Sequence, residues 1–328
     1  MEGIWKDRRR IHYVPSLIIL NTVKPHSCMT TVLGIVRQGH LVPEETWKRF
    51  ISSLATPFDE LETNKERAKH HLATLLTEAV RKRLGPNTGI LLSGGVDSST
   101  IALITKKLGH SPQCCTVGLE NSDDIEWARK AAEANNFNLK QKILSLDELE
   151  STIKKVIEIT KQNDIITVGV GVVTYTAAKM AKDGHCGSIM TGLGSEELFA
   201  GYERHLKAMG QGYEAVHAEC VAGLQMMRNR DLARDVSIAQ HFNLELFMPF
   251  LDKEFMKAAL SIHPLLKIDK MGSKIILREA AQQLGLQKDF AWRKKQAAQY
   301  GSSVIAGIEK LTKRKGFLSK KDYLNSLV

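Results

Sequence analysis

Leu91-Leu-Ser-Gly-Gly-Val-Asp-Ser-Ser99 is the stretch that decides the fold, because it joins an apolar strand to a helix through a turn of glycine and serine. The residues from Gly89 to Leu92 form a short apolar run, which is typical of a buried strand. From Asp97 to Leu108, apolar residues recur at helical spacing. Such a junction directs several backbone N–H groups to one point beside the positive end of the helix dipole. The sequence therefore predicts a site for a phosphate or pyrophosphate.

A magnesium ion would suit this site, with Asp97 as a ligand, because a hard cation bound to phosphates takes carboxylate oxygens. The turn lacks the Gly-Lys-Ser/Thr of the common mononucleotide loop, so it supplies no lysine to the terminal phosphates. The alternative interpretation is an ordinary Gly-Ser turn, in which Asp97 only complements the helix dipole.

Composition limits the classes of protein that fit the chain. Its 328 residues are 43% hydrophobic, enough for one large or two modest domains. No window approaches the apolar length of a membrane span, and no signal peptide is recognised. The five cysteines lack CxxC or zinc-ligand spacing, which argues against an iron–sulfur site or thiol-based sulfur transfer and favours a reducing, cytoplasmic location. They are Cys28, Cys114, Cys115, Cys186 and Cys220.

The net charge of +10 comes partly from basic clusters in residues 6–10 and 310–321. We interpret these clusters as solvated faces, since no basic stretch is interleaved with aromatic residues as in a single-strand binding platform. Nucleic acid is therefore an unsupported partner. The sequence gives no oligomeric state.

The chain divides into two regions that differ in their pattern of apolar and turn-forming residues. Residues 1–60 mix turn formers with short apolar runs, and we expect an N-terminal segment that is partly disordered, with Met29 as an alternative start. Residues 61–328 are expected to form one domain. There, strands are predicted over 89–92, 114–119, 139–144 and 187–191, and helices over 66–84, 97–108, 124–136, 147–160 and 168–180.

Strands that alternate with helices predict an α/β fold, a doubly wound parallel sheet with helices on both faces. Beyond Leu198 the sequence is mainly helical, with breaks at Pro249 and Pro264. A ligand of such a sheet lies at the carboxyl ends of the strands, near the topological switch point. The segments that follow strands at this edge are 93–99, 117–118 and 192–197.

A second glycine-rich motif follows the strand that ends at Thr191. Gly192 and Gly194 allow the backbone to approach a ligand closely, and Glu196 and Glu197 bring carboxylates to the same rim. A carboxylate that faces Asp97 would complete a magnesium–pyrophosphate site. The alternative, compatible with the first, is a helix start capped by the side chain of Ser195 with the glutamates in its first turn.

Five ordered motifs together resemble the synthetase domain of the asparagine synthetase family, within the superfamily of ATP-pyrophosphatases with a pyrophosphate loop (PP-loop). The resemblance runs from about Arg67 to Gly301. The motifs are Ser93-Gly-Gly-Val-Asp-Ser98, the stretch from Gly192 to Tyr202, Arg230-Asp231 with Leu244-Glu245 and Pro249-Phe-Leu-Asp252, Lys274-Ile-Ile-Leu-Arg-Glu-Ala280, and Trp292-Arg-Lys-Lys295. Ala200-Gly-Tyr-Glu-Arg-His205 and Gln299-Tyr-Gly-Ser302 are similar to the branch called asparagine synthetase domain-containing proteins.

The resemblance implies an adenine-nucleotide alpha-hydrolase-like fold with a mainly helical C-terminal part, and ATP and Mg²⁺ as cofactors. It implies magnesium ligands at Asp97 and at Glu196, where a glutamate replaces the family's more usual aspartate. Lys295 aligns with the lysine that stabilises the leaving pyrophosphate, so Lys295 and Asp97 are the predicted catalytic residues. The ATP-binding residues that it implies are Leu92, Ser93, Gly94, Gly95, Asp97, Ser98, Ser99, Val117, Gly118, Gly192 and Leu193.

Three other charged residues of these motifs are assigned less direct roles. We expect Lys274 to make a structural ion pair or a phosphate contact. For Asp252 and Arg278 we rank an internal ion pair above catalysis.

The chain departs from the family in two respects. Leu193 stands where the family has a glutamate that contacts the activated intermediate, and leucine cannot act as a base. We expect no glutaminase half, which needs an N-terminal nucleophilic cysteine, because only a short stretch precedes the loop in this sequence. We therefore expect ammonia to come from solution or from a separate glutaminase subunit.

The leading hypothesis is an ATP-dependent carbon–nitrogen ligase that adenylates a carboxylate, with aspartate as the default, releases pyrophosphate, and transfers ammonia or an amine to give an amide. One alternative is an adenylating enzyme with another acceptor, such as a tRNA base. The other is a nucleotide-binding regulatory protein with weakened turnover.

Overall fold

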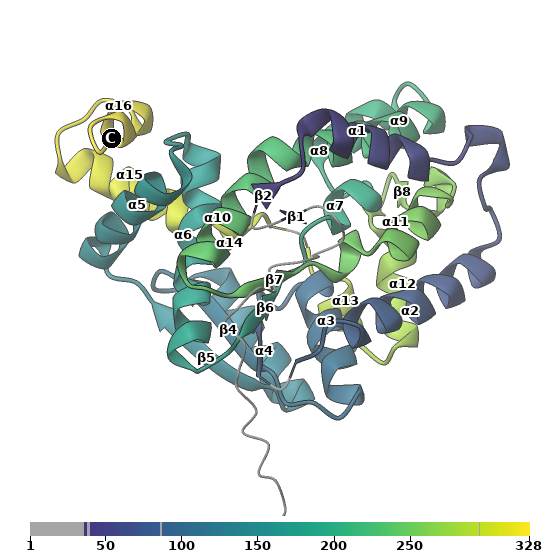
Figure 1. Ribbon diagram of the computed structural model, residues 1–328, viewed down its shortest axis with the longest axis horizontal. Coiled ribbons are helices and arrows are strands. Elements are labelled where there is room, and N and C mark those ends of the chain that lie inside the picture. Colours follow the sequence, from purple (N-terminus) through teal and green to yellow (C-terminus); the bar gives the residue numbers. More distant parts are fainter. Residues whose placement is uncertain (1–35, 38–39, 86, 295) are drawn as a thin grey trace, which may run out of the picture.

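The computed structural model describes residues 36–37, 40–85, 87–294 and 296–328. A parallel sheet lies at its centre (Figure 1), built from β3 (Thr88–Leu91), β4 (Gln113–Gly118), β5 (Asn138–Ile143), β6 (Ser188–Met190) and β7 (Glu245–Phe247). Two short antiparallel pairs lie outside it: β1 (Val36–Arg37) with β2 (His40–Leu41), and β8 (Ile268–Asp269) with β9 (Gly272–Ser273).

Helices surround this sheet and make up most of the C-terminal part. The α-helices are α1 (Glu44–Leu54), α2 (Lys65–Arg81), α3 (Val96–Lys107), α4 (Asp123–Asn135), α5 (Leu146–Thr160), α6 (Ile165–Asp183), α7 (Ser195–Leu198), α8 (Glu203–Met209), α9 (Tyr213–Met227), α10 (Ala233–His241), α11 (Lys253–Leu260), α12 (Ile275–Gln283), α13 (Lys288–Ala291), α14 (Ala298–Gly301), α15 (Val304–Arg314) and α16 (Lys320–Asn325). Short 3-10 helices span Phe58–Glu60, Pro249–Leu251 and Pro264–Leu266, and a π-helix spans Arg228–Leu232.

The strand order β5-β4-β3-β6-β7 places the topological switch point between β3 and β6. The chain leaves β3 for β4 and β5, and then returns past β3 to form β6 and β7, with every neighbouring pair parallel. The predicted α/β fold with a parallel sheet is confirmed. The loops after β3 and β6 meet at this switch point, which is where open sheets of this kind bind ligands.

The central strands are short apolar runs because both of their faces are covered. Ile90 of β3 pairs with Cys114 of β4 and with Met190 of β6, and all three side chains are fully buried. Helix α3 contacts β3, α4 contacts β4 and β5, and α6 contacts β3, β4 and β6. Such burial on two faces is the usual condition of a parallel strand.

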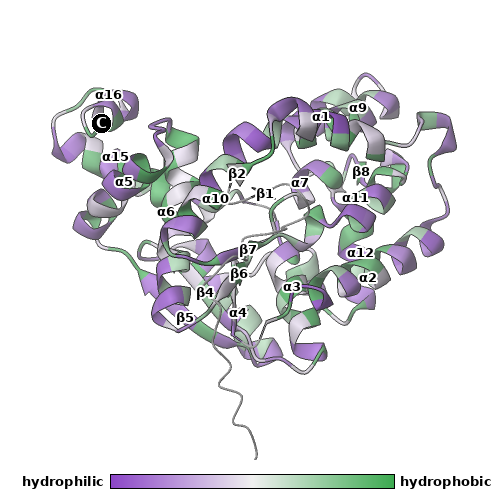
Figure 2. Ribbon diagram, in the orientation of Figure 1, coloured by the Kyte–Doolittle hydropathy of each residue, from purple (hydrophilic) through white to green (hydrophobic). Residues whose placement is uncertain are grey.

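The predicted elements in residues 61–191 are present, with ends shifted by a few residues. The largest shift is in α6, predicted over 168–180, because the carboxylate of Asp164 accepts from the N–H groups of Ile166 and Thr167 and starts the helix earlier. Pro249 and Pro264 each begin a 3-10 helix, in agreement with the predicted breaks. Helix α2 shows hydrophilic and hydrophobic residues along its length (Figure 2), as expected of a helix with one buried face.

Two features were not expected from the sequence. The edge strand β7 lies in the part that was predicted as mainly helical, and it pairs with β6. Helix α1 lies in residues 1–60, which were expected to be partly disordered; its Trp47, Ile51 and Leu54 side chains are buried in the same core as the sheet. The indole of Trp47 donates to the carbonyl oxygen of Leu224 on α9 at 2.7 Å. Helix α1 thus packs against the part of the chain that follows residue 60. The domain boundary near residue 60 stays a prediction.

Among the described residues, no helix combines the length and the apolar character that crossing a membrane requires.

Candidate active site

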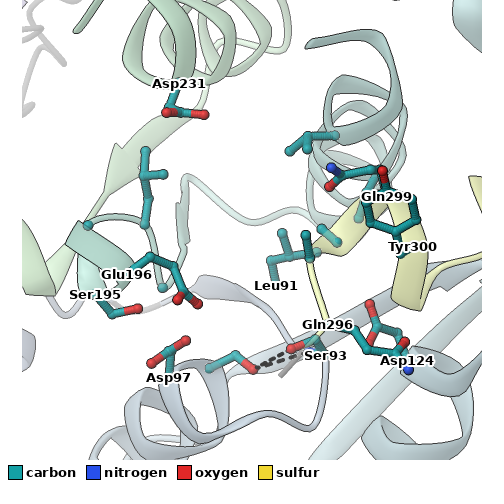
Figure 3. A pocket seen from close by; sticks show the side chains of 18 of the residues that line it. Leu91, Ser93, Asp97, Asp124, Ser195, Glu196, Asp231, Gln296, Gln299 and Tyr300 are labelled. Atoms are coloured by element: carbon teal, nitrogen blue, oxygen red, sulfur yellow. Dashed lines mark hydrogen bonds between the residues drawn. The ribbon is translucent and has the colours of Figure 1, made fainter. Parts of the chain in front are cut away.

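A pocket of about 460 Å³ lies at the carboxyl edge of the sheet, at the switch point between β3 and β6. Its wall comes from segments that are far apart in the chain. The loops after β3 and β6 and the end of β4 supply one part, α6, the π-helix and α10 another, and residues 296–300 a third. Figure 3 shows Asp97 and Glu196 on one side of the pocket, Gln299 and Tyr300 on the other, and Asp231 at a distance from both carboxylates.

The predicted phosphate loop is a tight turn that is closed by hydrogen bonds between its own residues. The N–H of Ser93 donates to Oγ of Ser98 at 3.1 Å, and the two hydroxyl oxygens are 3.2 Å apart, which closes the turn (Figure 3). Gly94 has φ of 75°, and a Cβ there would lie 2.5 Å from the carbonyl oxygen of Trp127. Only glycine fits this position, so the loop can pass directly over α4. Gly95 is the N-cap of α3, so the first N–H groups of this helix lie at the end of the loop.

Two carboxylates meet across the switch point and share one cation. Nζ of Lys274 lies 2.7 Å from Oδ2 of Asp97 and 2.5 Å from Oε1 of Glu196, and it also donates to Oγ of Ser195 at 3.0 Å. Burial would lower the pKa of Lys274, but the two carboxylates outweigh burial and raise it. Lys274 therefore makes the structural ion pair that was predicted.

The backbone around this cluster is tightly constrained. Lys274 adopts φ of 59°, a left-handed conformation that is rare for a residue with a Cβ. Its N–H donates to the carbonyl oxygen of Phe199 at 3.1 Å. A Cβ at Gly201 would lie 1.8 Å from Oε2 of Glu196, and a Cβ at Gly192 would lie 2.8 Å from that of Asp97. These two glycines let the motif after β6 close around the carboxylates.

The donor set fits a magnesium ion that is bound together with phosphates. Among the described residues, Oδ1 of Asp97 is buried and has no hydrogen-bond partner, so it keeps one free ligand position. No group of three or more His, Cys, Asp or Glu side chains in the described part of the chain could hold a metal by itself. Asp97 and Glu196 would therefore bind Mg²⁺ only with further oxygens from phosphates and water, as Mg²⁺ commonly requires.

The opposite end of the pocket is lined by paired charges. Arg234 is fully buried and donates to Oδ1 of Asp235 at 2.7 Å and to Oδ1 of Asp231 at 3.1 Å. Arg230, on the π-helix, donates to Oδ2 of Asp231 at 2.7 Å. Burial, with help from Asp231 and Glu196, raises the pKa of Glu197 to about 7. Single-turn π-helices are frequent at functional sites.

Residues 293 and 296, from the C-terminal part of the chain, are fixed to the phosphate loop and to the start of α4 by hydrogen bonds. Arg293 donates to Oδ1 of Asp124 at 2.8 Å and also hydrogen-bonds to the carbonyl oxygen of Ser93. Gln296 donates to Oδ2 of Asp123 at 2.7 Å. Burial raises the pKa of Asp124 to about 6, against the opposing effect of Arg293.

The structure brings most of the predicted ATP-binding residues to one wall. Those that line the pocket are Leu92, Ser93, Asp97, Ser98, Val117, Gly192 and Leu193, together with Glu196. Gly94, Gly95, Ser99 and Gly118 belong to the loop, the helix start and the strand end beside it. Lys295 lies outside the described residues, so its role stays a prediction.

Two predicted roles are wrong. Ser195 does not cap α7: the N-cap is Gly194, with φ of 98°, and the Ser195 hydroxyl contacts Lys274. Arg278 makes no ion pair with a described residue, because its guanidinium donates to the carbonyl oxygens of Ser273, Ala291 and Arg293. Asp252 does form the predicted ion pair, 3.0 Å from Arg83.

Sequence reasoning missed several residues of the wall. Asp124, Gln299, Tyr300 and Arg234 line the pocket, but none of them stands in a motif with a recognisable phosphate or metal pattern. Gln299 and Tyr300 were noted only as part of a resemblance. The pairing of Asp124 with Arg293 would have indicated this part of the wall. A single sequence does not show that two residues so far apart in the chain meet.

The family model for asparagine synthase matches residues 71–215 and 207–316 of the chain. The chain is 32% identical over 295 residues to a putative glutamine-hydrolyzing asparagine synthetase of Methanocaldococcus jannaschii, covering 79% of this chain and 54% of that protein. It is 33% identical over 295 residues to the glutamine-hydrolyzing asparagine synthetase of Homo sapiens, covering 86% and 49%. The chain thus spans about half the length of these curated relatives.

Among solved structures, an NMN synthetase from Francisella tularensis is a distant likeness. Its TM-score is 0.33 at 14% sequence identity, and the match covers 81% of this chain and 93% of that one. An NAD⁺ synthetase from Burkholderia pseudomallei gives a TM-score of 0.27 at 12% identity, over 83% and 97% of the two chains.

Proposed function

Because this chain belongs to the asparagine synthase family, we propose that its pocket binds ATP with Mg²⁺ and activates a carboxylate by adenylation, and that the activated carboxylate is then converted to an amide. The observation that carries the proposal is the meeting of Asp97 and Glu196 beside the Ser93–Ser98 turn. An anion cradle and two hard-cation ligands at one switch point suit a magnesium-bound pyrophosphate.

In the first step, an oxygen of the substrate carboxylate attacks the α-phosphorus of ATP, and the bond from that phosphorus to the bridging oxygen of the β-phosphate breaks. The amides of the loop and the start of α3 would hold the leaving pyrophosphate. Asp97 and Glu196 would hold Mg²⁺, which neutralises charge on the phosphates. Lys274 keeps the two carboxylates in place by its shared ion pair.

In the second step, ammonia or an amine attacks the carbonyl carbon of the acyl-adenylate. The carbon–oxygen bond to AMP breaks, the nitrogen loses a proton to water, and the amide and AMP leave. Leu193 lines the pocket and offers no group to take that proton. Aspartate is the proposed acceptor, and asparagine the proposed product.

We also propose that Lys295 stabilises the leaving pyrophosphate, that the protein is cytoplasmic, and that ammonia comes from solution or from a separate glutaminase subunit.

The test is the release of pyrophosphate and AMP from ATP in the presence of Mg²⁺, measured without acceptor, with aspartate, and with aspartate plus ammonium. We expect release that requires aspartate and is strongly reduced in Lys295→Ala, and asparagine that forms when ammonium is added. Formation of ADP and phosphate, or release that is independent of any carboxylate, would contradict the proposal.

A further inference from the structure

Lys267 is a fully buried lysine that does not line the pocket of the candidate active site. Its side chain is 0% exposed, and its Nζ has no hydrogen-bond partner in the described part of the chain. Neighbouring backbone fixes its position, since its N–H donates to the carbonyl oxygen of Pro264 at 2.8 Å and its own carbonyl oxygen accepts from Ile275 at 3.0 Å. A buried ammonium without partners is costly, so this group requires a counter-charge or must lose its proton.

The described carboxylates do not supply that counter-charge. Burial lowers the pKa of Lys267, and the opposing effect comes from the thiol of Cys220 and not from an acid. That thiol is itself fully buried, and burial raises its pKa, so it is neutral at neutral pH. Cys220 packs in a small cluster with the apolar side chains of Ala200, Val216 and Ile268.

A second buried donor lies on the neighbouring helix α8. Nδ1 of His205 accepts from the N–H of Tyr202 at 3.1 Å, so the ring hydrogen of the neutral imidazole is on Nε2. This Nε2–H is buried and has no acceptor on a described residue. Helix α9 packs against both α8 and the 3-10 helix that precedes Lys267. After burial and Arg204, the charge of Lys267 also lowers the pKa of His205, so the two groups are within electrostatic reach.

His217 of α9 faces the same charge but offers an acceptor. Its Nε2–H donates to the carbonyl oxygen of Thr56 at 3.1 Å, which leaves Nδ1 without a hydrogen and without a partner on any described residue. Burial, and then Lys267, lower the pKa of His217. A water molecule could join this acceptor to the two donors, but it would leave the charge of Lys267 uncompensated.

We propose that Lys267 and His205 bind a small monovalent anion, such as chloride, in the interior of the protein beside α9. The anion would accept hydrogen bonds from both donors and supply the missing negative charge. One negative charge matches one lysine, and the full burial of both side chains favours a small ion over phosphate. The anion would also favour the protonated imidazole, so the acid lability that a neutral His205 confers is expected in chloride-free buffer. The site is separate from the proposed function, because neither residue lines the pocket.

Thermal unfolding of the full chain, without ATP or Mg²⁺, tests the site. Sodium chloride replaces sodium gluconate step by step at constant ionic strength, since gluconate is too large for an enclosed site. The variant is Lys267→Met, which keeps the length of the side chain and removes its charge. Lys270→Met is the matched control, because it makes the same change on an exposed lysine in the turn between β8 and β9.

The melting temperature of the wild type should rise with chloride and then level off. The rise should be about 2 °C when about nine-tenths of the sites are filled. Lys270→Met should behave like the wild type, and Lys267→Met should show no rise that levels off. The absence of such a rise in the wild type, or an equal rise in Lys267→Met, would overturn the proposal.

Crystals of the wild type grown in sodium bromide provide a measurement that requires no variant to fold. Bromide is identified by its anomalous scattering, and we expect a peak within hydrogen-bond distance of both Nζ of Lys267 and Nε2 of His205. A map without that peak, or with a water molecule in its place, would overturn the proposal whatever the melting temperatures show.

Discussion

Arg293 and Asp124 are 169 positions apart in the chain, yet Nη2 of the arginine lies 2.8 Å from Oδ1 of the aspartate. Both side chains are 6% exposed. The same guanidinium bonds to the carbonyl oxygen of Ser93 and lies over the ring of Trp127, 5.4 Å from its centroid. One arginine thus joins the C-terminal segment to the phosphate loop and to α4.

Asp124→Ala should lower the free energy of unfolding by about 3–5 kcal/mol, because it leaves a buried guanidinium without its partner. Chemical denaturation monitored by circular dichroism measures this loss. The double variant Asp124→Ala/Arg293→Met should lose less than the sum of the two single variants, since it buries no unpaired charge. Additive losses would show that the two side chains do not interact.

Lys274→Met should make the stability of the protein depend on magnesium. The substitution removes the ammonium group that Asp97 and Glu196 share, so a divalent ion gains affinity for the pair. We expect MgCl₂ to raise the melting temperature of the variant more than that of the wild type in the absence of ATP. Sodium chloride at equal ionic strength is the control, and an equal rise in both proteins would refute the expectation.

Gly201→Ala should weaken binding of ATP in the presence of Mg²⁺ by about tenfold, equivalent to roughly 1.4 kcal/mol. The added methyl group would occupy the space of Oε2 of Glu196 and displace this carboxylate. Titration calorimetry with ATP and MgCl₂ gives the affinity. Gly187→Ala is the matched control because no atom lies within 4 Å of its added Cβ; a similar loss there would mean that the effect is not specific to the site.

The folded protein should lose stability in acid partly because it keeps the His205 side chain neutral. Burial, and then the charge of Arg204, lower the pKa of His205 from its ordinary value of 6.5 to about 4. Between these two values the unfolded chain binds the proton and the folded chain does not, so stability falls as the pH decreases from 6.5 to 4. Over that range the loss is on the order of 3 kcal/mol.

His205→Asn retains an acceptor for the N–H of Tyr202, which donates to Nδ1 of His205 at 3.1 Å. This variant should show a smaller decline in unfolding free energy over the same pH range, measured by denaturant titration at several pH values. An identical decline in both proteins would assign the acid lability to other groups.

The sheet and the position of its ligand edge could be predicted from the sequence because short apolar runs alternate there with amphipathic helices. Strand β7 was missed because it lies at the edge of the sheet and begins with the exposed Glu245, so it lacks the fully buried run of the equally short β6. Ser195 was predicted as a helix cap from its residue type alone, whereas the positive φ of Gly194 sets the start of α7.

Other residues of the pocket wall could not be predicted for a different reason. Arg234, Asp124 and Gln299 reach the pocket through tertiary packing of elements that are distant in the chain. Nothing local to these residues indicates a ligand. The phosphate loop and the carboxylate motif, by contrast, each lie within a single strand–turn–helix unit, so their chemistry could be predicted from a few adjacent residues.

The strand order also has a consequence for synthesis on the ribosome. One edge of β3 is covered by β6, and the hydroxyl oxygens of Thr88 and Ser188, 100 positions apart, lie 3.1 Å from each other. Until that second segment emerges, a nascent chain exposes an apolar strand with unpaired backbone groups next to the finished phosphate loop. Exposed edges of this kind favour association between chains. The nascent chain should therefore engage a chaperone most strongly after residue 91 has emerged, and release it once β6 is in place.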